Sequence, residues 1–201
     1  MNPHQATKDF EAALCAYTGA KYAVTTNSCT MALLLAMGWE RYRGDWTGVV
    51  ELPSRTYISV PQSAIHAGFK PVFIDKSWTG AYKLHPLPIW DCARMFTSAM
   101  YKLGQFQCVS FHSSKILGDT QGGAILHDND EADAWLRRAR FDGRTEGVAP
   151  KDDTFNQIGH HCYMSPDVAT RLLWKLSVLP KHNDPLPNDD YPDLSQMDIF
   201  K

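Results

Sequence analysis

The stretch SFHSSKILGDTQGGAIL, residues 110–126, carries the strongest fold signal in this chain of 201 residues. It begins at the end of one apolar run, CVSFH (108–112), and finishes in another, GGAIL (122–126). Short apolar runs bounded by glycine and polar residues are typical of buried strands. The stretch therefore predicts two strands joined by a polar loop, and that loop contains Lys115.

A carboxylate ends another apolar run upstream of this loop. Asp91 closes PLPIWD (86–91), which we interpret as a neighbouring strand. A lysine amine can form a Schiff base with pyridoxal phosphate, and a carboxylate can keep the cofactor's pyridine nitrogen protonated so that the ring accepts electrons. Lys115 and Asp91 are therefore the candidate catalytic pair of a pyridoxal phosphate site. The competing interpretations are a solvated loop lysine and an ordinary turn or helix-cap aspartate.

The composition limits the class of protein. Hydrophobic residues make up 44% of the chain and charged residues 21%, which suits one globular domain with a substantial core. The formal net charge of −2 predicts no nucleic-acid or anionic-membrane partner. No apolar run approaches the ~20 residues that span a bilayer, and the first residues do not resemble a secretory signal. The cysteines are odd in number and lie mostly in apolar stretches, which favours reduced thiols in a cytoplasmic protein.

Strands and helices alternate along the chain as far as residue 142. We expect strands at 22–26, 49–53, 71–75, 87–91, 107–112 and 122–127, and helices at 7–17, 31–42, 60–68, 130–143 and 165–179. Continuous apolar strands that alternate with helices predict an α/β fold with a mostly parallel, helix-covered sheet. We expect one domain over residues 1–180. Residues 181–201, rich in Pro and Asp, should form an extended or disordered tail.

Five segments in order resemble the DegT/DnrJ/EryC1/StrS family of sugar aminotransferases. They are FEAALCAYTGAKYAVTTNSCTMALLLA (10–36), ELPSRTYISVPQSAIHAGFKPVFID (51–75), IWDCARMF (89–96), VSFHSSKILGDTQGGAIL (109–126) and GHHCYMSPDVATRLLWKL (159–176). The resemblance extends from about residue 8 to about residue 179 and implies the large domain of a fold-type I pyridoxal phosphate-dependent transferase, the aspartate aminotransferase-like fold. The chain stops about where the family's smaller C-terminal domain should begin.

The resemblance also assigns roles to individual residues. Lys115 would form the Schiff base and move a proton between cofactor and substrate, and Asp91 would pair with the pyridine nitrogen. Tyr57 would stack on the pyridine ring, although a core tyrosine is nearly as good an interpretation. Arg94 replaces a glutamine that contacts the cofactor's 3-oxygen, where a cation would keep that phenolate ionised.

The phosphate group of the cofactor would lie against residues 28–30. Ser28, Cys29 and Thr30 precede an apolar helix, so their N–H groups and hydroxyls can cradle a phosphate, although simple helix capping would use the same residues. Ser110 would add a hydroxyl from the strand before Lys115. Cys29 stands where the family usually has glycine.

Three further positions depart from the family pattern. Gln121 replaces a usual glutamate, and His161 and Tyr163 stand where the family has asparagine and arginine that reach the partner subunit's cofactor. His161 would donate a hydrogen bond to the phosphate in the neighbouring subunit. The resemblance therefore implies a homodimer with shared sites.

The function that the resemblance implies is amino transfer to a nucleotide-linked keto sugar, with glutamate or glutamine as donor, in sugar biosynthesis. Lys115 argues against the family's dehydratases, in which histidine replaces the lysine. An alternative is a shortened cofactor-binding relic, or part of an enzyme completed by another polypeptide. A purely structural or interaction protein is the third interpretation.

Two other motifs have simpler interpretations. GHHCY (159–163) contains three possible metal ligands, but no second His/Cys cluster at ligand spacing accompanies it, so no metal is expected. RRARFDGR (137–144) has no interleaved aromatics or basic surroundings, so we interpret it as the solvated end of a helix.

Overall fold

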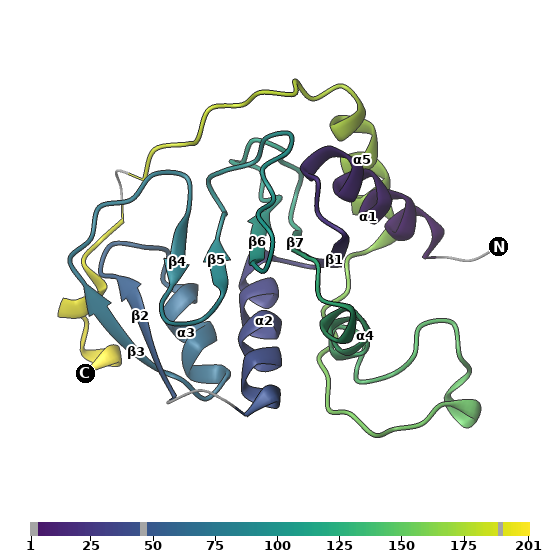
Figure 1. Ribbon diagram of the computed structural model, residues 1–201, viewed down its shortest axis with the longest axis horizontal. Helices are drawn as coiled ribbons and strands as arrows, with labels where there is room; N and C mark the ends of the chain where they lie inside the picture. Colours follow the sequence, from purple (N-terminus) through teal and green to yellow (C-terminus); the bar gives the residue numbers. More distant parts are fainter. Residues whose placement is uncertain (1–3, 45–47, 189–190) are drawn as a thin grey trace.

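The computed structural model describes residues 4–44, 48–188 and 191–201. Its centre is a five-stranded sheet in the order β1-β7-β6-β5-β4 (Figure 1). The strands are β1 (Tyr22–Thr26), β7 (Gly123–His127), β6 (Phe106–Ser110), β5 (Ile89–Asp91) and β4 (Tyr82–Leu84).

A two-stranded sheet lies beside β4. Its strands, β2 (Val49–Pro53) and β3 (Lys70–Ile74), run parallel. One bridge joins it to the segment after β4, where the Glu51 amide donates to the His85 carbonyl at 2.7 Å. The pair therefore extends the layer formed by the main sheet.

The sheet is mixed, so the expectation of a mostly parallel sheet is wrong. In the five-stranded sheet only β5 and β6 pair in parallel, and the β1–β7, β6–β7 and β4–β5 pairs are antiparallel. The error has a physical cause. A continuous apolar run shows that a strand is buried on both faces, but it does not encode the strand's direction.

Helices cover both faces of the main sheet. α1 (Gln5–Thr18) and α5 (Pro166–Ser177) pack together and bury one apolar core around Phe10 and Leu172. α2 (Cys29–Arg43), α3 (Ser59–His66) and α4 (Asp130–Ala139) enclose a second core around Leu35 and Ile125. No described helix is both long and apolar enough to cross a membrane.

A buried ion network connects α1, β1 and α4. Glu11 of α1 accepts hydrogen bonds from Arg140, just after α4, and from the Thr25 amide of β1. Arg140 is 1% exposed and also donates to the Thr25 carbonyl at 2.8 Å, while Arg137 Nη1 lies 2.7 Å from Glu11 Oε2. The network therefore holds β1, the strand that leads directly to residues 28–30.

Residues 180–188 and 191–201, here called the strap, cross the molecule from the end of α5 to the edge formed by β2 and β3 (Figure 1). The strap is extended except for two single turns of 3₁₀ helix at Leu194–Gln196 and Asp198–Phe200. Its amides reach back to the domain: Leu186 N donates to Arg94 O and Leu194 N to Ser54 O, both at 2.8 Å.

Candidate functional site

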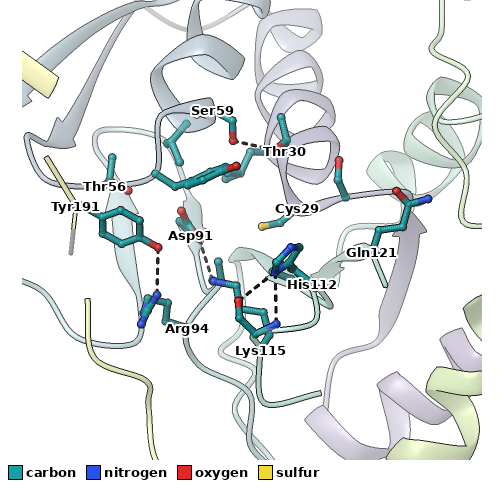
Figure 2. A pocket seen from close by; sticks show the side chains of 18 of the residues that line it. Cys29, Thr30, Thr56, Ser59, Asp91, Arg94, His112, Lys115, Gln121 and Tyr191 are labelled. Atoms are coloured by element: carbon teal, nitrogen blue, oxygen red, sulfur yellow. Dashed lines mark hydrogen bonds between the residues drawn. The ribbon is translucent and has the colours of Figure 1, made fainter. Parts of the chain in front are cut away.

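A cavity of about 340 Å³ opens where β5 and β6 end and where α2 and α3 begin (Figure 2). Small-molecule sites commonly have volumes of about 300–1,000 Å³. The residues expected from the sequence that line it are Ser28, Cys29, Thr30, Tyr57, Asp91, Arg94, Ser110 and Lys115. Segments far apart in the sequence therefore meet at one site.

Asp91 is held at the end of β5 with both carboxylate oxygens in use. Oδ2 accepts a 2.9 Å hydrogen bond from the Tyr82 hydroxyl, and Oδ1 accepts one from the Ala93 amide at 2.9 Å. The residue is 4% exposed, and burial raises the pKa of its carboxyl group. Among the described residues Asp91 forms no ion pair, so a buried carboxylate without a bound cation lines the pocket.

Lys115 lies in the loop between β6 and β7, as the sequence predicts. Its amide donates to the His112 carbonyl at 2.9 Å, which fixes the turn that carries the side chain. Burial lowers the pKa of the Lys115 amine, and the positive charge of Arg94 lowers it further. A lowered pKa leaves more of the amine uncharged, the form that attacks a carbonyl group.

The start of α2 and the start of β7 approach each other closely. The Ser28 hydroxyl caps α2 by accepting the Met31 amide at 3.2 Å. A Cβ on Gly123 would lie 2.5 Å from the Cys29 nitrogen, so only glycine allows this approach. The Thr30 hydroxyl lies 2.8 Å from that of Ser59. The positive end of α2 and three hydroxyls therefore face the cavity, an arrangement that suits a phosphate.

Cys29 contributes a neutral thiol to this loop. Burial raises its pKa well above the usual value, and the charge of Asp91 raises it further. The side chain is therefore a packing group and not a reactive thiolate.

Aromatic rings line the open side of the cavity. Tyr57 is 57% exposed, and its ring meets the edge of Tyr191 at a centroid distance of 6.5 Å. Trp78 stacks on Tyr191 at 6.1 Å with an interplanar angle of 16°. Tyr57 therefore lines the cavity that contains Lys115, as the sequence predicts.

Several pocket residues were not identified from the sequence. Tyr82 and Thr56 form a buried pair of hydroxyls 2.6 Å apart behind Asp91, and Ser59, Trp78, His112 and Tyr191 line the cavity. The alternation of Tyr82 and Leu84 in YKL is a short strand signal that could have revealed β4. Tyr191 carried no local signal, because its position depends on where the strap crosses the domain.

The remaining departures from the family pattern occupy different places. Gln121 lines the same cavity. His161 does not; its Nδ1 lies 2.8 Å from Asp142 Oδ2, and its ring meets Tyr163 edge-on at 4.9 Å. The His161 side chain is 71% exposed, and its contact with a partner subunit stays a prediction. Within the described ranges no group of three or more His, Cys, Asp or Glu side chains could hold a metal ion.

The residues present fit pyridoxal phosphate. The buried Asp91 carboxylate without a cationic partner suits a protonated ring nitrogen, and the narrow Gly123–Ser28 contact at the start of α2 suits the phosphate. Lys115, with an amine of lowered pKa, lines the same cavity and suits the aldehyde carbon. These three groups would hold the ring nitrogen, the phosphate and the aldehyde carbon of the cofactor.

Comparison with known proteins supports the same family assignment. The sequence pattern of the DegT/DnrJ/EryC1/StrS aminotransferase family matches residues 2–99 and 85–184. A UDP-4-amino-4,6-dideoxy-N-acetyl-beta-L-altrosamine transaminase of Campylobacter jejuni is 26% identical over 82% of this chain and 54% of its own length. The spore coat polysaccharide biosynthesis protein SpsC of Bacillus subtilis is 41% identical over 34% of this chain and 17% of its own length.

Solved structures share the fold. The Helicobacter pylori PseC, an aminotransferase involved in the biosynthesis of pseudoaminic acid, superposes with a TM-score of 0.73 at 17% identity over 88% of this chain and 58% of its own. A sugar aminotransferase from Micromonospora echinospora superposes with a TM-score of 0.75 at 17% identity, over 87% of this chain and 61% of its own. The expected aspartate aminotransferase-like fold class is thereby confirmed. The chain spans little more than half the length of these relatives.

Proposed function

Because the chain belongs to the DegT/DnrJ/EryC1/StrS aminotransferase family, we propose that it binds pyridoxal phosphate and transfers an amino group to a keto sugar. The observation that carries the proposal is the meeting of Lys115 and Asp91 in one cavity, although Asp91 ends β5 and Lys115 lies in the loop between β6 and β7. When bound, the cofactor supplies an aldehyde that accepts amines and a ring that accepts electrons.

Each polar residue of the site has a task in this proposal. Lys115 provides the amine that links to the cofactor and that takes and returns a proton at the reacting carbon. Asp91 keeps a proton on the ring nitrogen, and Tyr82 orients the carboxylate that does so. Ser28, Thr30 and the α2 N-terminus hold the phosphate, with Cys29 packing below.

Three more residues complete the assignment. Ser110 adds a hydroxyl for the phosphate from the end of β6, and Tyr57 presents its ring to the cofactor plane. Arg94 gives a cation for the cofactor's phenolate oxygen. These contacts bind and orient the cofactor, and Lys115 carries the chemistry.

The substrate and assembly are proposed from the family relationship. The Campylobacter jejuni relative is named as a transaminase of a UDP-linked amino sugar, which supports a nucleotide-linked keto sugar as acceptor. Glutamate or glutamine would be the donor. We propose a cytoplasmic homodimer in which His161, exposed on its own face, approaches the partner's cofactor phosphate. Sedimentation at micromolar concentration with and without pyridoxal phosphate tests the dimer, and a monomer in both conditions would contradict it.

The test of cofactor binding is covalent trapping. Wild type mixed with pyridoxal phosphate and then borohydride should carry one stable label on the peptide that contains Lys115. Lys115→Ala should lose the label, whereas Lys83→Ala, which changes a lysine that does not line the cavity, should keep it. Recovery of the label on Lys83 or Lys102 would overturn the assignment.

A second measurement separates transfer from binding alone. Glutamate added to the loaded protein should bleach the visible band of the lysine-bound cofactor. The departures from the family pattern at His161 and Tyr163 favour the alternative, a cofactor-binding protein that needs another polypeptide for transfer. A stable band that glutamate leaves unchanged would support that alternative.

A further inference from the structure

Arg94 is held in the pocket by a residue of the strap. Its Nη1 donates a 3.2 Å hydrogen bond to the hydroxyl of Tyr191, 97 residues away (Figure 2). The guanidinium also lies over the Tyr191 ring, 5.7 Å from its centroid, a cation–π distance. Both side chains line the cavity that contains Lys115. The strap therefore reaches the proposed cofactor site through one side chain.

The strap also fixes the backbone of Arg94. The Arg94 carbonyl accepts the Leu186 amide at 2.8 Å, and the Arg94 amide donates to the Gly80 carbonyl at 3.2 Å. At Gly80, with φ of 71°, a Cβ would lie 2.7 Å from Pro185 Cβ, so the strap packs directly on this turn. The Arg94 side chain is thus fixed both at its backbone and at its guanidinium group.

Tyr191 is itself firmly placed. Its ring stacks on Trp78, whose indole N–H donates to the Arg55 carbonyl at 2.9 Å. Its carbonyl accepts from Arg55 Nη1 at 3.4 Å, and Asp193 bridges to Arg55 two residues further on. A side chain held in this way can position a second one, because its own freedom is already restricted.

The charge of Arg94 has no anionic partner among the described residues. No ion pair joins it to a described carboxylate, and its buried Nε atom has no hydrogen-bond partner. A guanidinium that is partly withdrawn from water without a counterion favours a bound anion. The positive charge of Arg94 also disfavours a second positive charge nearby, so it lowers the pKa of the Lys115 amine in the same cavity.

We propose that Tyr191 is a positioning residue, whose hydroxyl and ring hold the Arg94 guanidinium in the pocket so that its positive charge acts on the Lys115 amine and it contacts an oxyanion of the ligand. The identity of that oxyanion, the phenolate of pyridoxal phosphate, rests on the proposed function. The effect on Lys115 does not, because it belongs to the protein without cofactor.

The direction of the effect on Lys115 follows from its neighbours. The groups that face the amine are Arg94 after β5, Asp91 at the end of β5 and Cys29 of α2. Burial and Arg94 lower the pKa of the amine, and the carboxylate of Asp91 raises it, while the Cys29 thiol is neutral. If Arg94 leaves the pocket, only burial still opposes the ammonium form, so the pKa of Lys115 must rise.

The test measures the reactivity of each lysine in the cofactor-free, full-length chain. Trace acetic anhydride at a series of pH values, followed by mass spectrometry of the peptides, gives a titration curve for Lys115 with Lys83 as internal reference. Tyr191→Phe keeps the ring and removes only the acceptor for Arg94. It should move the Lys115 curve to higher pH and slow its acetylation severalfold at neutral pH.

Three variants sharpen the test. Arg94→Gln should move the Lys115 curve in the same direction and further. Tyr42→Phe removes a hydroxyl from a tyrosine on α2 that does not line the cavity, and it should change nothing. Added to Arg94→Gln, Tyr191→Phe should have no further effect, because its action passes through Arg94. If Tyr191→Phe acted only through a loss of packing, its effect on the Lys115 curve would instead add to that of Arg94→Gln in the double variant.

The outcomes separate this inference from the proposed function. An unchanged Lys115 curve in Tyr191→Phe, beside a shifted curve in Arg94→Gln, would overturn the role of Tyr191. A wild type that fails to bind pyridoxal phosphate would overturn the proposed function while the Lys115 curves still decide on Tyr191. When the cofactor binds, Tyr191→Phe should weaken its apparent affinity severalfold, and Tyr42→Phe should not.

Discussion

The hydroxyl of Tyr82 donates a 2.9 Å hydrogen bond to Oδ2 of Asp91, and both side chains are buried. The same hydroxyl lies 2.6 Å from that of Thr56, so a chain of three polar groups extends behind the pocket. Such a chain stabilises the ionised form of Asp91 against the burial that raises its pKa. The structure thus adds a residue to the site that motif comparison does not supply.

We expect Tyr82→Phe to raise the pKa of Asp91 further, because the carboxylate loses a donor. Carbon NMR of labelled aspartate in the cofactor-free protein measures this change. Folding stability should fall by about 1 kcal/mol, the usual effect of losing one hydrogen bond. Tyr101→Phe is the matched control, since it also removes a bonded hydroxyl, which donates to Gln105 O at 3.0 Å and not to Asp91. It should leave the Asp91 titration unchanged.

Asp91→Asn should change how stability depends on pH in the cofactor-free protein. Because the folded pKa of Asp91 is raised above 3.8, the unfolded chain releases this proton first as pH rises. Wild type therefore loses stability from Asp91 as pH rises from 3.8 through the folded pKa, and the variant does not. Denaturant titrations at several pH values should show that the unfolding free energy of the variant rises relative to that of wild type across this pH range. A constant difference would mean that Asp91 does not titrate as described.

Gly123→Ala should disturb the proposed phosphate site at residues 28–30, because the added methyl group would collide with their backbone. Its Cβ would lie 2.5 Å from both the Ser28 carbonyl carbon and the Cys29 nitrogen, which are backbone atoms that cannot swing away. We expect a loss of roughly 1–3 kcal/mol in unfolding free energy and weaker binding of pyridoxal phosphate. Gly104→Ala, at φ of 75° with no atom within 4 Å, provides a control with backbone strain alone. Equal cofactor affinity in both variants would contradict this phosphate site.

Glu11→Gln should destabilise the protein by about 3 kcal/mol, because it removes the nearer of the two carboxylates that pair with the buried Arg140 and leaves only Glu146, at 3.5 Å. Burial opposes the charge of Glu11, but Arg140 and Arg137 outweigh it and lower the pKa below 4.5. The contribution of Glu11 is therefore present above 4.5 and is lost as pH falls through the folded pKa. Acid denaturation curves should show this component in wild type only. Lys21→Gln, which breaks the exposed Lys21–Asp130 pair, should have little effect.

The sequence was sufficient where a signal is local. Gly19 ends α1 with φ of 83°, and Ser28 caps α2, as residue type and spacing predict. Lys115 and Asp91 were identified because each follows an apolar strand, and strand ends on the same side of a sheet meet at one edge. The helices and most strands were located within a few residues for the same reason.

The directions of the strands, the hydroxyl groups behind Asp91 and the path of the strap were decided only by tertiary structure. β1 and β6 both pair antiparallel with β7, which apolar runs cannot encode because burial is the same in either direction. Tyr82 belongs to the site because β4 pairs with β5 and places it opposite Asp91. Tyr191 belongs to the site because it contacts Arg94, 97 positions away in the sequence. The sequence alone therefore determined which residues can do chemistry. Which of them meet, and with what charge, depends on the burial and packing that only the folded chain creates.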